Sequence, residues 1–94
     1  MLRYTAAYTQ DEGWYCAQVL DFPGAISQGK TLNSARRNLA DALQLMAESY
    51  LLDGKPLPRP KARVHDNRAD VVEPIYLTVR ARAPLSRQVA RRSA

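Results

Sequence analysis

The stretch VLDFPGAISQGKT, residues 19–31, decides the fold because it joins the end of one strand to the start of a helix. Within Asp21-Phe22-Pro23-Gly24, the proline lacks a backbone donor and the glycine relaxes the backbone, so the strand must break there. Residues 25–28 resume an extended pattern and predict a short third strand. Thr31 is the expected N-cap of the helix, because its hydroxyl can accept a hydrogen bond from a free amide of the first turn.

The residues before this stretch predict an antiparallel hairpin. Residues 2–9 alternate with a period of two, which places every second side chain on one buried face of a strand. Residues 10–13 are polar and end in Gly13, which can adopt a positive φ, and residues 14–20 are rich in aromatic and β-branched side chains. The first buried face consists of Leu2, Tyr4, Ala6 and Tyr8.

An amphipathic helix is predicted to cover this sheet. The helix lacks an acidic residue in its first turn, and Ser34 stands where a glutamate would reach back, so we expect no capping box. Asp53-Gly54 supplies the helix exit, and three prolines in residues 56–60 prevent its continuation. Apolar residues recur at helical spacing along one side, namely Leu32, Ala35, Leu39, Ala42, Leu43, Met46, Ala47 and Tyr50.

The last predicted element is a strand over residues 74–79, with Pro74 at its first position, where a missing donor is tolerated. Residues 61–73 are polar and show no clear period. The resulting order, β-β-β-α-β, predicts an α+β fold with one helix packed on a small antiparallel sheet. The 94 residues suffice for one modest core, so residues 1–79 are predicted to form a single domain. Unpaired strand edges predict a homodimer or a higher homo-oligomer.

The excess positive charge of the chain lies at its C-terminal end. Residues 1–79 contain nine basic and nine acidic side chains, whereas residues 80–94 contain five arginines and no acid. A neutral body with a basic tail favours a protein-binding surface plus a flexible appendage. The tail is interpreted either as a nucleic-acid contact or as a solvated end. Its basic residues are Arg80, Arg82, Arg87, Arg91 and Arg92.

Membrane and secreted proteins are disfavoured by the sequence. No apolar run approaches the roughly 18 residues of a membrane span, and the N-terminal residues lack the apolar core of a secretory signal. The single cysteine, Cys16, cannot form an internal disulfide. We therefore expect a cytoplasmic protein.

The sequence also lacks a catalytic constellation. Metal-dependent phosphodiester cleavage needs several carboxylates converging on ions about 4 Å apart. Asp11 and Asp21, however, lie near opposite ends of one predicted strand. The only histidine, His65, falls in a polar stretch, and no basic residue beside Cys16 in the sequence would activate its thiol. We expect a binding protein with no enzymatic activity, no cofactor and no metal.

An ordered set of motifs resembles the HicB family of antitoxins and their stand-alone relatives. The resemblance covers about residues 2–60 and depends on the order and spacing of short motifs rather than on any one of them. The turn and cap positions that match are Gly13, Pro23, Gly24, Gly29, Thr31 and Gly54. The motifs themselves are Tyr8 to Gly13-Trp14, Asp21-Phe22-Pro23-Gly24, Gly29-Lys30-Thr31, Ala35, and Asp53-Gly54-Lys55-Pro56-Leu57-Pro58.

The resemblance implies a partial RNase H-like fold and a role in a type II toxin–antitoxin system. Family members bind and neutralise a small toxin, HicA, which cleaves messenger RNA. Many members also carry a DNA-binding segment after the last strand, but the fifteen residues after Val79 are too few for a helix-turn-helix. The alternative function is that of an orphan HicB-like nucleic-acid-binding or regulatory protein that acts through its arginine-rich tail.

Five residues are predicted to contact a basic toxin: Asp11, Glu12, Asp21, Phe22 and Asp53. The acids would complement the positive charge of an RNA-binding partner. Two of these assignments have open alternatives, since Phe22 can instead complete the core and Asp21 can instead cap its own turn. Trp14 is expected to serve core or hairpin packing.

Overall fold

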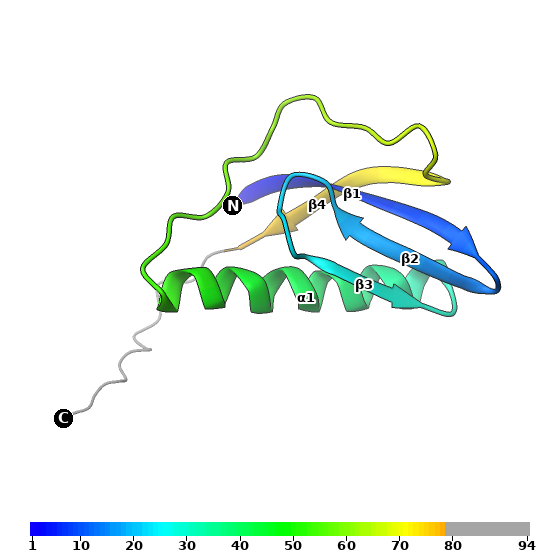
Figure 1. The fold of residues 1–94 in the computed structure, drawn as a ribbon, viewed down its shortest axis with the longest axis horizontal. Coiled ribbons are helices and arrows are strands. Elements are labelled where there is room, and N and C mark those ends of the chain that lie inside the picture. Colours follow the sequence, from blue (N-terminus) through cyan, green and yellow to red (C-terminus); the bar gives the residue numbers. More distant parts are fainter. Residues whose placement is uncertain (79–94) are drawn as a thin grey trace.

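The computed structural model describes residues 1–78 and confirms the α+β fold. In chain order the elements are β1 (Leu2–Asp11), β2 (Trp14–Val19), β3 (Ile26–Gly29), α1 (Leu32–Leu52) and β4 (Val71–Leu77) (Figure 1). The predicted order β-β-β-α-β is therefore correct. The arginines of residues 80–94 lie outside the described residues.

The four strands form one antiparallel sheet in the order β3-β2-β1-β4. The predicted hairpin of β1 and β2 pairs Tyr8 with Ala17 and Ala6 with Val19. Strand β4 adds to the other side of β1, where Ile75 pairs with Tyr4. Helix α1 runs along one face of this sheet, and no helix of residues 1–78 covers the other face (Figure 1). We call the uncovered side the outer face.

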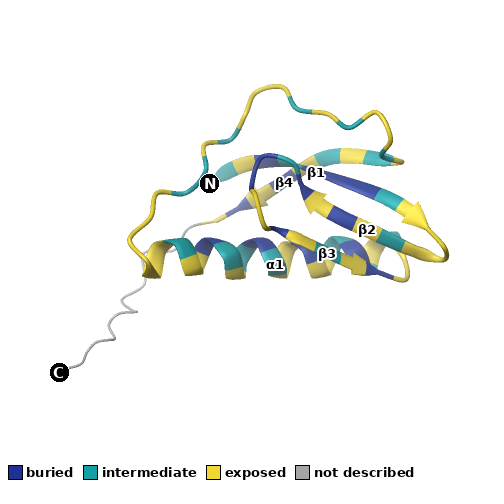
Figure 2. Cartoon of the chain, in the orientation of Figure 1, coloured by how far each residue is buried: buried dark blue, intermediate teal, exposed yellow. Residues whose placement is uncertain are grey.

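The core lies between the sheet and α1, as the periodicity predicts. The helix buries Ala35, Leu39, Leu43 and Ala47, while Leu32, Met46 and Tyr50 pack against them partly buried. From the sheet, the predicted inward residues Tyr4, Ala6 and Tyr8 are buried, and Leu2 is partly buried. Ala17 and Val19 of β2 are buried beside them. Figure 2 shows this buried layer where α1 faces the strands.

The start of α1 differs from the prediction in one respect. Thr31 is the N-cap, as expected, and its Oγ1 accepts a hydrogen bond from the Ser34 amide at 3.0 Å. The expectation of no capping box is wrong, because Ser34 Oγ accepts a hydrogen bond from the Thr31 amide at 3.1 Å. A serine hydroxyl thus replaces the usual longer side chain in reaching back to the cap.

Gly29 explains how the chain enters α1 so closely after β3. A Cβ atom built on Gly29 would lie 2.4 Å from the Ala35 amide nitrogen and 2.4 Å from Ser34 Oγ. The first turn of the helix therefore packs directly against the end of β3, and no side chain fits between them. Gly29, the first residue of the predicted motif Gly29-Lys30-Thr31, is therefore a steric requirement of this junction.

Strand β4 begins three residues earlier than predicted, at Val71. Pro74 consequently lies in the middle of the strand and not at its first position. The sheet tolerates the missing donor because β4 is an edge strand. The polar residues 61–70, for which the sequence indicated no structure, belong to a long connection that leaves α1 and crosses to β4 (Figure 1).

Candidate partner-binding surface

Phe22, one of the predicted partner contacts, is buried. Its side chain is 0 % exposed, and its ring packs edge-on against Tyr4 at 5.2 Å and against Tyr50 at 5.3 Å between centroids. It therefore joins the first strand to the last turns of α1. Of the two interpretations left open by the sequence, the structure supports completion of the core.

Asp21 is buried as well, with 3 % of the residue exposed. One carboxylate oxygen accepts the Thr5 amide and the other accepts the Lys61 amide, each at 3.0 Å. The carboxylate thus fastens the connection between α1 and β4 to the sheet. The expectation that Asp21 presents its charge to a toxin is corrected, because both oxygens bind this chain's own backbone.

The hairpin tip between β1 and β2 is the exposed counterpart of that turn. Asp11 and Glu12 are exposed there, and Glu12 (φ 50°) and Gly13 (φ 83°) make the tight turn. Trp14 follows directly and is 39 % exposed, with the Lys30 ammonium nitrogen 5.1 Å from the centroid of its ring. Trp14 therefore packs on the hairpin and not in the core, and it remains accessible to a partner.

Asp53 lies far from this tip. It is the C-cap of α1, at the end of the helix remote from the β1–β2 turn (Figure 1). The structure therefore brings Asp11 and Glu12 together, separates Asp53 from them, and buries Asp21 and Phe22. The five predicted residues do not form one surface.

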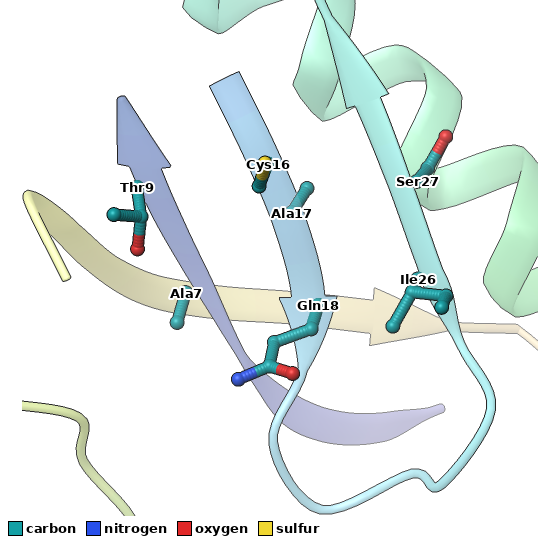
Figure 3. Close-up of a pocket in the computed structure, with 7 residues that line it drawn as sticks. All are labelled: Ala7, Thr9, Cys16, Ala17, Gln18, Ile26 and Ser27. Carbon is teal, nitrogen blue, oxygen red and sulfur yellow. The ribbon is translucent and has the colours of Figure 1, made fainter. Parts of the chain in front are cut away.

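The outer face of the sheet is a feature that the sequence interpretation missed. Ile26 is 64 % exposed and Tyr76 is 54 % exposed, and Val72 is also exposed. Beside Ile26 a shallow hollow of about 380 Å³ opens over β1, β2 and β3 (Figure 3). Its lining consists of Ala7, Thr9, Cys16, Ala17, Gln18, Ile26 and Ser27.

Strand parity was the signal that could have revealed this surface. Trp14, Cys16 and Gln18 alternate with the buried side of β2, so all three belong to the outer face. The hairpin tip and the hollow are consequently continuous along β2. An accessible surface runs from Asp11 and Glu12, past Trp14, to Ile26.

Titratable side chains of the described chain gather where α1 meets β4. Within residues 1–78 no group of three histidine, cysteine or carboxylate side chains could hold a metal ion. Arg36 and Glu73 form a bidentate pair at 2.8 and 2.9 Å, which joins α1 to β4. Burial first, then the nearby Glu73 charge and hydrogen bond, raise the pKa of Tyr8 to about 12. This cluster stabilises the contact between helix and sheet.

The length and polarity of α1 bear on whether this helix could cross a membrane. Within the described part of the chain, no helix combines the length and the apolar composition needed to span a membrane. Helix α1 has 21 residues but buries only one side of itself.

Solved structures that are similar to this fold include HicB antitoxins. The N-terminal domain of the Burkholderia pseudomallei antitoxin HicB matches with a TM-score of 0.69 and 22 % identity, over 83 % of this chain and 100 % of that chain. The larger Burkholderia pseudomallei HicB structure matches with a TM-score of 0.71 and 22 % identity, over 83 % of this chain and 63 % of that one. The HicA3 and HicB3 toxin–antitoxin complex matches with a TM-score of 0.57 and 23 % identity, over 64 % and 71 %.

Sequence comparison gives the family. No family model matches the chain. The UPF0150 protein Ta0767 of Thermoplasma acidophilum is 36 % identical over 62 residues, which cover 65 % of this chain and 90 % of that relative. These findings confirm the resemblance expected from the motifs. The chain therefore belongs to the UPF0150 family, and it has the HicB-like fold of the antitoxin N-terminal domain.

Proposed function

We propose that this chain is an antitoxin-like binding protein that neutralises a small, basic, HicA-like toxin by direct contact. The observation that carries the proposal is an accessible acidic and aromatic surface on a fold shared with the HicB antitoxin. The HicA3 and HicB3 complex adds support, because a fold of this kind occurs there together with a toxin. The role is one of binding, in the cytoplasm, without a cofactor.

The surface has the composition of a protein contact. Trp14 offers a large, rigid ring, and tryptophan is enriched among residues that dominate binding energy. Asp11 and Glu12 stand beside it and would attract a basic partner. The exposed apolar side chain of Ile26 extends the contact onto the outer face. The opposite face of the sheet is occupied by α1, so the outer face is the one left for a partner.

The test is binding and growth rescue with a HicA-like toxin from the same host. A Trp14→Ala variant and an Asp11→Lys/Glu12→Lys variant are compared with Asp41→Lys/Glu48→Lys, which reverses two exposed charges of α1. We expect the first two variants to lose about tenfold or more in affinity and to stop rescuing growth. The helix variant should bind and rescue like the unaltered chain.

Two results would contradict the proposal. One is failure of the unaltered, folded chain to bind any such toxin in a salt-resistant complex. The other is an equal loss of affinity in the tip variants and in the helix variant, which would mean that the tip is not the contact.

A second candidate function is supported by the sequence alone. The five arginines of residues 80–94 account for the whole net charge of +5. If each neutralises one phosphate of a duplex, the logarithm of affinity falls with the logarithm of salt with a slope of roughly −4.5. Replacing all five by glutamine should abolish retention on a duplex and leave toxin neutralisation intact. Retention that survives the replacement would exclude the tail as its cause.

Self-association is part of the proposal. Strands β3 and β4 are the two edges of the sheet within the described residues, and unpaired edge groups favour strand pairing with a second copy. Light scattering should therefore report a dimer or a larger homo-oligomer. A monomer across the accessible concentration range would remove this part of the proposal.

A further inference from the structure

The connection between α1 and β4 contains a concentrated block of positive charge, which we call the basic strap, residues 54–65. It holds Lys55, Arg59, Lys61 and Arg63 and no acidic residue. The rest of residues 1–78 holds nine acidic and five basic side chains. The body of the protein is therefore neutral in total but strongly divided, with the strap positive and the remainder negative.

The strap is fastened to the core at defined points. The Tyr4 hydroxyl donates to the Pro58 carbonyl oxygen at 2.7 Å, and the Lys61 amide donates to the buried carboxylate of Asp21 at 3.0 Å. Leu57 packs against the hydrophobic core. Prolines in residues 56–60 further restrict the backbone. The strap is thus a held segment, and its charged side chains are presented from a fixed backbone.

All four charged side chains of the strap are exposed, as Figure 2 shows for most of the connection. Within residues 1–78 the ion pair that forms is Arg36–Glu73, and none of the strap residues takes part in one. Arg59, Lys61 and Arg63 recur at every second position. The chain makes no bend between Arg59 and Lys61, and two residues of extended chain span about 7 Å, on the order of the distance between successive phosphates of one extended nucleic-acid strand. A bend at residues 62 and 63 follows, so Arg63 lies beyond this straight part.

We propose that the basic strap binds the phosphate backbone of single-stranded nucleic acid. A single row of charges follows one strand, whereas a duplex presents two rows and calls for a broader basic surface. Arginine and lysine side chains that neutralise phosphates release counterions, which makes the binding strong at low salt and independent of sequence. This inference does not depend on the proposed toxin binding, because the strap shares no residue with the hairpin tip or the outer face.

The experiment measures the anisotropy of a labelled single strand of roughly 16 nucleotides, in RNA and DNA forms, over a range of salt. The strap variant is Arg59→Gln/Lys61→Gln. Its matched control is Lys30→Gln/Arg37→Gln, which removes the same two kinds of exposed charge elsewhere. Each pair is made in the full chain and in a full chain whose five tail arginines are glutamine, so that tail and strap are separated.

For the strap variant we expect the slope of log affinity against log salt to become shallower by roughly 1.4. If the variant and the unaltered chain bind equally at ~1 M salt, the variant then binds ~25-fold more weakly at ~0.1 M salt. The control should change little beyond its effect on net charge. The Arg59→Lys variant, which keeps the charge, should retain most of the binding that Arg59→Gln/Lys61→Gln loses. Thermal unfolding of each variant checks that the fold is intact.

Three results would overturn the inference. Equal losses in the strap variant and its control would mean that net charge alone is responsible. Binding that vanishes with the tail arginines and is insensitive to the strap would place the contact in the tail. Tighter binding to a polyglutamate peptide or to a duplex than to a single strand would assign the strap to a different kind of partner.

Discussion

Two turns of the same sheet differ in whether their side chains are buried. The turn of residues 21–24 and the hairpin tip of residues 11–14 each combine a carboxylate, a large aromatic side chain and a glycine. In the first, Asp21 and Phe22 are almost completely buried; in the second, Trp14 is exposed, as are the acids beside it. Local sequence is similar, so the difference must come from what lies over each turn.

The covering elements account for the difference. The end of α1 brings Tyr50 against Phe22, and the basic strap brings the Lys61 amide to Asp21. At the hairpin tip, the Lys30 ammonium nitrogen lies over the Trp14 ring, and Trp14, Asp11 and Glu12 stay exposed. A turn therefore becomes part of the core when segments distant in sequence close over it, and remains a binding surface when they do not.

The largest effect should come from truncating the aromatic residue of each turn. Phe22→Ala removes a buried ring that joins Tyr4 and Tyr50, and it should lower the free energy of unfolding by about 3–5 kcal/mol. Trp14→Ala should lower it by less, about 1 kcal/mol, because the residue is 39 % exposed and lies outside the hydrophobic core. Urea unfolding of both variants measures the difference. Equal losses would mean that the two turns are not distinguished by burial.

The second largest difference in stability should come from removing one acidic side chain from each turn. Asp21→Ala leaves the Thr5 and Lys61 amides without their acceptor in a partly buried site, which should cost about 2–4 kcal/mol. Asp11→Ala, at the exposed tip, should change stability by about 0.5 kcal/mol or less. Proteolysis provides a second measurement, since Asp21→Ala should open the strap to cleavage near Lys61. A strap that resists cleavage in this variant would show that Leu57 and Pro58 hold it unaided.

The sequence sufficed for the elements that depend on local patterns. The alternation of residues 2–9, the helical stripe and the Thr31 cap each predicted what the structure contains. The α+β fold followed from their order. The start of β4 was not predictable in the same way, because Pro74 is tolerated by the edge position of its strand, which is a property of the whole sheet.

The candidate site was predicted less completely than the fold, and for a physical reason. Composition identifies Asp21 and Phe22 as turn residues with the chemistry of a contact, but their burial depends on Tyr50 and Lys61, which lie 28 and 39 residues beyond Phe22. Burial of this kind carries no local signal. Trp14 is the opposite case: it was assigned to core or hairpin packing, although its strand parity with Gln18 is a local signal that could have placed it on the outer face, where it is 39 % exposed.

Coverage by α1 should also make stability depend on alkaline pH. The pKa of Tyr8 is raised from 10.0 to about 12, mainly by burial. Between these values the folded state keeps a proton that the unfolded chain has lost. The stabilisation is therefore complete below pH 10 and is lost as the pH rises through about 12.

Denaturant unfolding from pH 9 to pH 12 tests this dependence. Tyr8→Phe should reduce the fall in the free energy of unfolding as pH rises. Tyr76→Phe, at the exposed outer face, should leave that fall unchanged. Some decline should persist in Tyr8→Phe, because burial also raises the pKa of Tyr4. An unchanged profile in Tyr8→Phe would contradict the assignment.

The smallest predicted difference in stability is between alanine substitutions at the two turn glycines. Gly13 (φ 83°) and Gly24 (φ 91°) both occupy the left-handed region, so alanine at either position should cost about 1–2 kcal/mol. A Cβ atom on Gly13 would meet nothing within 4 Å, whereas one on Gly24 would lie 2.7 Å from Met46 Cε of the covering helix. Gly24→Ala should therefore be the more costly, by about 1 kcal/mol or less, since a flexible methionine end can move aside.

A double-mutant cycle with Met46→Ala isolates that excess. If α1 is what distinguishes the covered turn from the exposed one, shortening Met46 should remove the extra cost of Gly24→Ala and leave the cost of Gly13→Ala unchanged. If the excess persists, it arises within the turn itself, from the close backbone hydrogen bonds of Phe22, Gly24 and Ala25, and not from the helix above it. The cycle thus assigns the difference between the two turns either to the segments that cover them or to the turns alone.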